Sequence, residues 1–554
     1  MANDFPTLSK AMAGALMRLG SGQCSRSGRY AQYTMPTGAV KPQSEDPVTA
    51  SIIYGGAALL REEGGREPRV CQNAGVYQTG GVVQEIGAVS DLRRKYPNVA
   101  TIGSLDEILL PGLINSHHHV GITSLQLGTL DQPLETTFAA RLAHRDVDPY
   151  LDTLHSAFEM IASGITSVHH LHNPRRGSVR QWRPAAERIL DAYRAVGMRV
   201  TYSFMVRVQS RIIYGDDEKF VRDLPEALQR SAQEHLESYS AGLDQFVEHF
   251  EGLYKAHAGD PRVAIYLAPG NLHWCTDESL VALARLAKDY SVGMHMHLLE
   301  TPYQRAYAYR STGKSAVRYL SDLGILGPDL TLGHCAWCSE EDLDLIAASG
   351  TMTCHLPSSN LRLHNGIAPL RAFLDRGITV ALGMDECTLN DDRDILFEMR
   401  LASKLHHAPG IGNRSPTGAE IIAMATESAA KTTGFAGRTG VLSPGYAADC
   451  LLIDRRRLGY PYLDESVPAL DAVLYRAKPG HVNTVIVDGE ILYQNGVFTR
   501  LDAEAARSDL AERMKSPLTE EDLARRRFAQ ALVPHVARHY DGWLDSVTPL
   551  RSGL

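Results

Sequence analysis

The chain has 554 residues, of which 44% are hydrophobic, 22% charged and 7% aromatic, and its formal net charge at pH 7 is −8. These proportions are typical of a globular enzyme and exclude a disordered, collagen-like or disulfide-scaffold chain. The mildly acidic balance, with no block of Lys and Arg, argues against nucleic acid as a partner.

Two further features of the sequence bear on where the protein works. No apolar run reaches the roughly 18 residues that cross a bilayer, so we expect no membrane association and a cytoplasmic location. The eight cysteines are scattered along the chain, as in proteins with reduced thiols. Cys335 and Cys338 form a CxxC pair, but the sequence has no second pair to complete a structural zinc site.

The first 110 residues predict an arm followed by β structure. Residues 1–48 are rich in Gly, Ser, Thr and Pro, and we interpret them as an N-terminal arm. Residues 49–110 contain short β-like runs broken by glycines, and Gly80-Gly81 suits a hairpin turn. We therefore expect the first part of a β domain over residues 49–110.

Residues 111–436 alternate between strand-like apolar runs and helical patterns. Apolar residues at helical spacing predict a helix over residues 151–162, and Gly164 then separates it from a strand-like run. Similar strand–helix units recur along this segment, with about eight strands in all. This repetition favours a (β/α)8 TIM barrel over an open doubly wound α/β sheet.

β-like runs return over residues 437–500, and a helical pattern follows over residues 501–554. Because the ends of a domain often lie close together, we expect residues 437–500 to join residues 49–110 in one small β-sandwich domain. Thr519 and Asp522 have the spacing of a capping box, which predicts a C-terminal helix. We expect this helical extension to pack on the body of the protein or on a partner subunit.

Histidines follow several of the predicted strands, at the end where barrel enzymes build their active sites. The first group is His117-His118-His119. Because side chains two apart on a strand point the same way, His117 and His119 can both face the barrel axis while His118 points outward. Two neutral imidazoles that converge on one point make half of a metal site.

Other strand ends carry comparable side chains. His295 and His297 are two apart, Glu300 follows them, and His334 and Asp385 end two later strands. Taken singly, each could be a buried histidine bonded to the backbone or a helix-capping carboxylate. Taken together, they form a set of nitrogen and oxygen ligands that a barrel mouth would bring to one place.

Several runs resemble the metal-dependent amidohydrolase superfamily, namely PGLINSHHH, HLLET, GHCAW, PSSNLRLHNGIAPL and GMDECTLNDD. The resemblance covers about residues 50 to 497 and indicates the branch of aminohydrolases and chlorohydrolases that act on cytosine, guanine, adenosine-type and triazine rings. It implies one divalent metal ion, Zn²⁺ or Fe²⁺, held by His117, His119, His297 and Asp385. Members with two ions usually have a carboxylated lysine at the end of the fourth strand, and the run VAIYLAPGN has none, so we expect one ion per subunit.

The resemblance also implies the reaction. Glu300 and His334 would be the acid/base and water-orienting groups, and Asp385 would take a proton from a metal-activated water. We interpret the chain as an enzyme that hydrolytically deaminates an amino-substituted N-heterocycle. The alternatives are hydrolysis of an amide, urea or carbamate C–N bond, halide displacement by the same water, and a scaffold protein that has lost its metal.

Further residues at the expected mouth are candidate substrate contacts, although His172 could equally be a loop histidine bonded to the backbone. Glu386 adds a carboxylate where many relatives carry a small residue, which would suit a substrate with amino donors or positive charge. We expect a small-molecule substrate and a homodimer or larger homo-oligomer. The candidate contacts are His172, His355, Asn360, Glu386 and Asn390.

Overall fold

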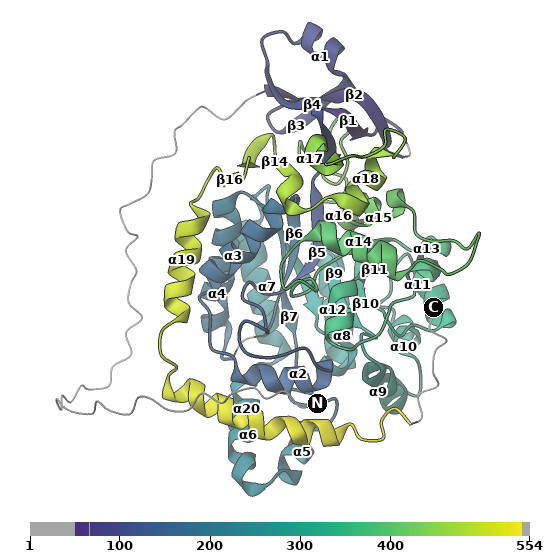
Figure 1. Cartoon of the computed structure of the whole chain (residues 1–554). Coiled ribbons are helices and arrows are strands. Elements are labelled where there is room, and N and C mark those ends of the chain that lie inside the picture. The colour runs from purple at the N-terminus through teal and green to yellow at the C-terminus, as the bar shows by residue number, and fades with distance from the viewer. Residues whose placement is uncertain (1–49, 66, 175, 546–554) are drawn as a thin grey trace, which may run out of the picture. The chain divides into compact units, whose positions relative to one another are not determined.

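The computed structural model describes residues 50–65, 67–174 and 176–545 (Figure 1). The arm expected over residues 1–48 and the end of the helical extension after residue 545 lie outside the described residues. The described part contains two eight-stranded sheets, one parallel and one mostly antiparallel.

The parallel sheet is the barrel. Within the described residues its eight strands are neighbours in chain order. The last strand returns to the first, because the backbone N–H of Asp385 donates to the carbonyl of His117 at 2.9 Å and Asp385 bridges to His118. This closed barrel confirms the predicted TIM-barrel class. Its strands are β5 (Leu113–His118), β6 (Ile165–His172), β7 (Arg199–Val206), β8 (Val263–Pro269), β9 (Met294–Leu298), β10 (Leu330–His334), β11 (Met352–His355) and β12 (Val380–Leu382).

The helices around the barrel begin and end for local reasons that α3 (Pro149–Ala162) illustrates. The side chain of Asp148 accepts hydrogen bonds from the first N–H groups of α3, Pro149 occupies its first turn, and Gly164 follows it with φ +97°. The side chains that α3 buries at helical spacing include Leu154 and Phe158. The other helices of the barrel segment are α2 (Leu134–Ala140), α4 (Val179–Val196), α5 (Asp217–Asp223), α6 (Glu226–Ser238), α7 (Leu243–His257), α8 (Asp277–Tyr290), α9 (Pro302–Thr312), α10 (Ala316–Asp322), α11 (Glu340–Ser349), α12 (Pro357–Arg362), α13 (Leu370–Asp375), α14 (Ile395–Leu405), α15 (Gly418–Met424) and α16 (Glu427–Lys431).

The second sheet joins the two segments that flank the barrel, as predicted. β4 pairs antiparallel with β13, and Gly80-Gly81 forms the β2–β3 hairpin with φ values of +57° and +81°. The edge strand β3 returns to the sheet through a bridge between Val82 and Ala447, so the sheet folds over its own apolar core. Its elements are β1 (Ala50–Leu60), β2 (Arg69–Thr79), β3 (Val82–Ala88), α1 (Val89–Lys95), β4 (Ala100–Pro111), β13 (Cys450–Asp454), α17 (Arg455–Gly459), α18 (Ala469–Arg476), β14 (Val482–Val487), β15 (Glu490–Gln494) and β16 (Val497–Phe498).

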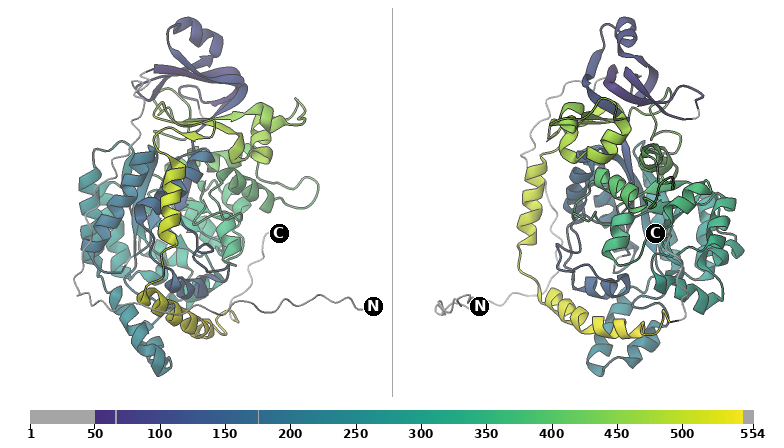
Figure 2. Two further views of the ribbon diagram at one scale, coloured as in Figure 1. Left: turned by 60° about the vertical axis from the view of Figure 1, so that its left-hand side comes forward. Right: turned by 45° about the vertical axis from the view of Figure 1, so that its right-hand side comes forward.

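The helical extension consists of α19 (Ala503–Met514) and α20 (Glu520–His539). The expected capping box starts α20, since the N–H of Asp522 donates to Thr519 Oγ1 and the N–H of Thr519 donates to Asp522 Oδ2. Figures 1 and 2 show α19 beside α3 and α20 below α2, in agreement with their contacts. None of the described helices is both long enough and apolar enough to cross a membrane.

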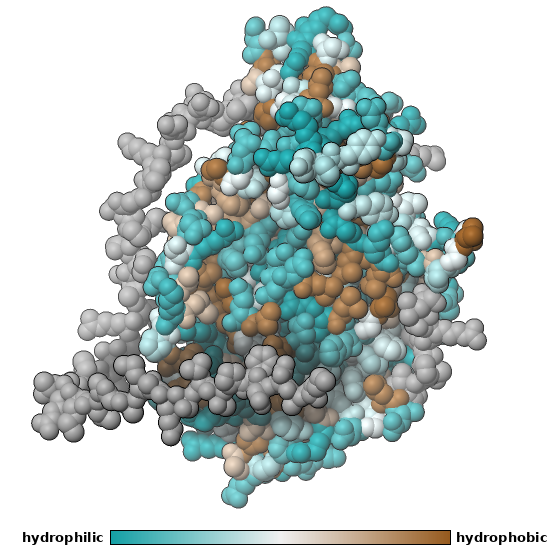
Figure 3. Space-filling view, in the orientation of Figure 1, coloured by the Kyte–Doolittle hydropathy of each residue, from teal (hydrophilic) through white to brown (hydrophobic). Residues whose placement is uncertain are grey.

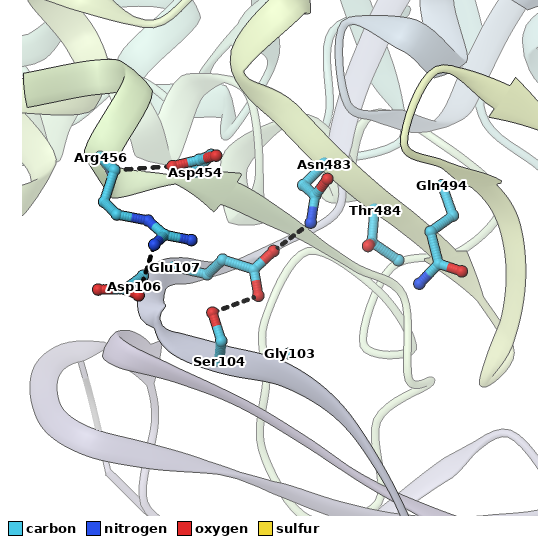
Figure 4. Close-up of a pocket in the computed structure, with 9 residues that line it drawn as sticks. All are labelled: Gly103, Ser104, Asp106, Glu107, Asp454, Arg456, Asn483, Thr484 and Gln494. Atoms are coloured by element: carbon cyan, nitrogen blue, oxygen red, sulfur yellow. Dashed lines mark hydrogen bonds and ion pairs between the residues drawn. The ribbon is translucent and has the colours of Figure 1, made fainter. Parts of the chain in front are cut away.

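Two features of the surface are visible in the figures. Hydrophilic side chains predominate on the face drawn in Figure 3, and its apolar side chains gather over the barrel. A polar cavity of about 270 Å³ lies in the β domain (Figure 4), where Glu107 accepts hydrogen bonds from Asn483 and Ser104. The residues that line this cavity do not include the predicted site residues.

Candidate metal centre

Four of the predicted ligands meet at one end of the barrel. His119 Nε2 lies 3.0 Å from His117 Nε2 and 3.2 Å from His297 Nε2. Asp385 Oδ1 lies 3.1 Å from His119 Nε2 and 3.9 Å from His117 Nε2. His118, between the two histidines, instead packs against His170. The barrel therefore brings three imidazole nitrogens and one carboxylate oxygen together from β5, β9 and the end of β12.

These distances fit a divalent metal ion. Zinc binds imidazole nitrogen at about 2.0–2.1 Å, so two nitrogens in a tetrahedral site lie about 3.3 Å apart. The separations of 3.0, 3.2 and 3.1 Å are close to that value, and the 3.9 Å between Asp385 Oδ1 and His117 Nε2 is longer by about half an ångström. The residues present therefore have both the chemistry and the spacing of a metal site.

The opposite side of each imidazole ring fixes its orientation. His119 Nδ1 donates to the carbonyl of Leu171 at 2.5 Å, and His297 Nδ1 donates to the carbonyl of Gly270 at 3.1 Å. Each of these bonds leaves Nε2 with its lone pair directed to the centre. Burial lowers the pKa of His297 well below its usual value, so its ring is neutral at pH 7, as a metal ligand must be.

The backbone at the barrel seam is unusual. Asp385 has φ +58°, in the left-handed region that costs a residue other than glycine about 1–3 kcal/mol. Its N–H donates to the carbonyl of His117 and its carbonyl accepts from the N–H of His119, so barrel closure holds this conformation. A Cβ on Gly383 would lie 2.6 Å from the Cβ of His117, which explains glycine at this close approach.

Glu300 and His334 lie beside the four ligands. His334 Nε2 is 3.7 Å from Glu300 Oε1, and His334 Nδ1 donates to Asn360 Oδ1 at 2.9 Å. Glu300 Oε1 also accepts from Asn365 Nδ2 at 2.8 Å. The second oxygen, Oε2, accepts from Gln304 Nε2 at 3.4 Å.

The two carboxyl groups of the centre, Glu300 and Asp385, differ in protonation state. Burial, helped by the charge of Asp385, raises the pKa of Glu300 to about 8. Burial also acts to raise the pKa of Asp385, but the imidazoles of His119 and His334 beside it and the hydrogen bond from Ser359 outweigh burial and hold that pKa below the usual range. At pH 7 Glu300 is therefore protonated and Asp385 ionised, which separates an acid from a base.

The structure places two of the five candidate substrate contacts near this centre or its loops. Asn360 is fully buried in α12 and accepts the hydrogen bond from His334. Glu386 follows Asp385, accepts from Ser124 Oγ at 3.0 Å and forms an ion pair with Arg141. Glu386 therefore already has a cationic partner in Arg141, and its contact with a substrate stays a prediction.

The other three candidates have partners elsewhere. His172 Nδ1 lies 2.5 Å from Tyr202 Oη, and His355 Nε2 lies 3.0 Å from His406 Nε2. Asn390 is exposed, and its N–H donates to Thr388 Oγ1.

His295, named from the sequence as a possible ligand, instead lies behind His117, with its Nε2 3.0 Å from His117 Nδ1. Three further residues around the centre were not singled out from the sequence. Ser359 Oγ donates to Asp385 Oδ2 at 2.5 Å. Gln304 lies four residues after Glu300, one turn into α9, a spacing that could have indicated its contact with Glu300. Asn365 belongs to the same polar run as Ser359, and the density of such residues in that run was the available signal.

Comparison with known proteins places the chain among characterised sequences. Residues 108–492 match the model of the Amidohydrolase family. The 5'-deoxyadenosine deaminase of Methanosarcina mazei is 29% identical, over 80% of this chain and 96% of that protein. The 5-methylthioadenosine/S-adenosylhomocysteine deaminase of Pyrococcus furiosus is 30% identical, over 76% of this chain and 91% of that protein.

Solved structures share the fold. An adenosine deaminase from Xanthomonas campestris with bound zinc aligns with a TM-score of 0.70 and 22% identity, covering 86% of this chain and 98% of its own. Atrazine chlorohydrolase TrzN from Arthrobacter aurescens, complexed with zinc, aligns with a TM-score of 0.72 and 22% identity, covering 83% and 99%. At this identity the similarity establishes the barrel and its flanking sheet.

Proposed function

Because the chain belongs to the amidohydrolase family, we propose that it is a zinc-dependent deaminase that hydrolyses the exocyclic amino group of an adenosine derivative. The substrate class rests on the deaminase names of relatives that match most of the chain at 29–30% identity. Zinc rests on the donor set described above and on its presence in similar solved structures.

One arrangement supports deamination most directly, namely the convergence of Glu300, His334 and Asp385, each of which has a side-chain nitrogen or oxygen atom within 4.8 Å of those of the other two. Displacement of an amino group from a purine requires a proton on a ring nitrogen and another on the departing nitrogen. Glu300 has a proton to give at pH 7, and Asp385 can accept one. The two groups that this chemistry needs are therefore held at one place.

In this proposal His117, His119, His297 and Asp385 hold a single ion. When bound, such an ion lowers the pKa of water from 15.7 towards about 7 and supplies a nucleophile at neutral pH. The run Val263–Pro269 of β8 contains no lysine, which supports one ion rather than a pair bridged by a carboxylated lysine.

The remaining steps concern protons on this chain. Asp385 takes a proton from the attacking water while Glu300 gives its proton to the ring nitrogen beside the reacting carbon. Asp385 then passes its proton to the amino nitrogen, the C–N bond breaks and ammonia leaves. His334 donates its Nδ1 proton to Asn360, so its Nε2 is the nitrogen that can carry a proton. This Nε2 carries the hydroxyl proton of the adduct to Glu300 Oε1, which is 3.7 Å away. The water is thereby consumed and Glu300 is ready for another cycle.

Ammonia release tests this function. The purified chain is incubated with 5'-deoxyadenosine, 5'-methylthioadenosine, S-adenosylhomocysteine, adenosine, guanine and cytosine, and its zinc content is measured in parallel. We expect ammonia from at least one adenosine derivative and about one zinc per subunit. Turnover of amides, ureas or chlorotriazines with no ammonia from this panel would replace deamination by the alternative reactions. Less than about a tenth of an equivalent of metal, with no turnover, would instead indicate a scaffold protein.

A further inference from the structure

The helical extension lies outside the matched family region, which ends at residue 492, and packs on the catalytic side of the barrel. α20 contacts α2 and the short helical turn Arg141–Ala143. Both elements belong to the connection that follows β5, the strand that carries His117. In Figures 1 and 2, α20 crosses this end of the barrel below α2.

α20 shares an apolar cluster with three of the connections that follow barrel strands. The cluster contains Ala139 after β5, Phe220 after β7 and Ala306 after β9, together with Leu532 and Val536 of α20. It is separate from the main barrel core. The extension therefore adds a shared apolar contact to three loops at this end of the barrel.

The residues that follow α20 contact both ends of α9. Tyr540 is 6% exposed, and its ring lies edge-to-face on Tyr303 at 5.2 Å between centroids. The ring of Trp543 lies 4.4 Å from the guanidinium carbon of Arg310. Because α9 begins two residues after Glu300, the contact between Tyr540 and Tyr303 bears on the segment that sets the direction of the Glu300 side chain.

Hydrogen bonds continue from Tyr540 to the same segment. Tyr540 Oη accepts from the N–H of Tyr214 at 3.0 Å, and Tyr214 Oη donates to Glu135 Oε1 at 3.1 Å. Thr301 Oγ1 donates to that same oxygen at 2.6 Å. Glu135 is 3% exposed, so these bonds are shielded from water.

Thr301 is the last member of this series before Glu300. Its Oγ1 accepts from the N–H of Gln304 and so caps α9. The side chain of Gln304 in turn holds both the backbone N–H and the Oε2 of Glu300. The path from Tyr540 to Glu300 thus runs through hydrogen bonds and through the residue Tyr214, which binds Tyr540 with its backbone N–H and Glu135 with its hydroxyl.

We propose that Tyr540 of the helical extension is a positioning residue for Glu300, acting through Tyr214, Glu135 and the start of α9. The proposal rests on the function given above for Glu300. It assigns the extension a part in the reaction, because a misplaced proton donor slows the chemical step even when substrate still binds.

The substitution Tyr540→Phe tests this role in the full-length zinc enzyme. It keeps the ring on Tyr303 and removes the hydroxyl that accepts from Tyr214. We expect kcat to fall about tenfold with KM changed less than about twofold. In a Glu300→Asp background, where the donor is already displaced, the same substitution should lower kcat by less than about twofold.

Amide hydrogen exchange gives a readout that does not depend on turnover. Tyr540→Phe should speed exchange over residues 300–306, whereas Tyr290→Phe should leave it unchanged. Tyr290 is a suitable control because its hydroxyl donates to Glu251, a contact between α8 and α7.

The outcomes separate this proposal from the proposed function. Unchanged exchange over residues 300–306, or an equal loss of kcat with and without the Glu300→Asp substitution, would overturn the role of Tyr540. If the unaltered enzyme released no ammonia from any compound, the proposed function would fail, and the exchange measurement alone would decide whether Tyr540 orders the Glu300 segment.

Discussion

His334 Nε2 lies 3.7 Å from Glu300 Oε1, and the two side chains are 0% and 5% exposed. Neither group needs to move far to exchange a proton with the other, directly or through one water. Because Asn360 engages the opposite nitrogen of His334, the nitrogen facing Glu300 is the one free to accept. This arrangement makes Glu300 the first residue to test.

The substitution Glu300→Gln removes the transferable proton and retains the size of the side chain. We expect kcat to fall about 10²–10⁴-fold, the usual contribution of a general acid. Zinc content should stay unchanged, because Glu300 is outside the proposed ligand set. Steady-state ammonia release and metal analysis would check both expectations. The matched control is Glu187→Gln, which changes an ion pair on α4 away from the centre. A Glu300→Gln enzyme with unchanged kcat would exclude Glu300 as the proton donor.

We expect His295 to raise the metal affinity of the centre by holding the ring of His117 in place. Its Nε2 lies 3.0 Å from the Nδ1 of His117, and it fixes the ring from the side opposite the ligand nitrogen. Outer partners of this kind change metal affinity about 10–100-fold, so His295→Leu should weaken zinc binding by that factor and recover activity in excess zinc. Competition with a chelator measures the affinity. The exposed His407→Leu is the control, and an unchanged zinc affinity in His295→Leu would contradict the expectation.

Glu398 should make stability depend on pH. Burial raises the pKa of Glu398 to about 8 from a usual value of 4.5, and its carboxyl accepts from the N–H of Ser358 at 2.9 Å. Between pH 4.5 and about pH 8 the folded state binds more protons than the unfolded state. The contribution of Glu398 to the free energy of unfolding therefore falls as pH rises, by up to about 1.4 kcal/mol per pH unit.

Glu398→Gln should remove that contribution. We expect the unfolding free energy of the unaltered protein, relative to that of the variant, to decrease from pH 6 to pH 8. Urea unfolding at several pH values would measure it. A constant difference across this range would show that Glu398 keeps the same charge throughout.

A buried ion pair joins the barrel to the β domain. The guanidinium of Arg199, on β7, is 0% exposed, and its Nε donates to Asp449 Oδ2 at 2.6 Å. Asp449→Ala would leave this cation buried with half its partners, and removal of one member of such a pair costs about 3–5 kcal/mol. Asp91→Ala breaks only the exposed pair with Arg94 and should cost at most about 1 kcal/mol. Chemical unfolding of both variants compares the two losses, and equal losses would contradict the structural role of Asp449.

The sequence was informative where short-range geometry decides the outcome. The alternation His117-His118-His119 predicted which rings face inward, and the recurring strand–helix pattern predicted the barrel. Each of these features depends on the period of a strand or helix, which a single sequence displays.

Contacts between distant segments could not be obtained in this way. Arg141 neutralises Glu386 although the two are 245 residues apart, and nothing in the spacing of either residue indicates the other. The packing of α20 on α2 is of the same kind, because amphipathic periodicity shows that a helix has an apolar face but not which element covers it.

The closure of the barrel between β5 and β12 also bears on how the protein matures. His117 and His119 enter the centre from one side of that seam and Asp385 from the other. A nascent chain that has left the ribosome only as far as β11 thus carries the histidines without the carboxylate. A metal ion that binds the complete set, as proposed above, would favour the finished barrel over partly folded chains by mass action. Scarcity of the metal during synthesis would consequently reduce the yield of folded protein as well as its activity.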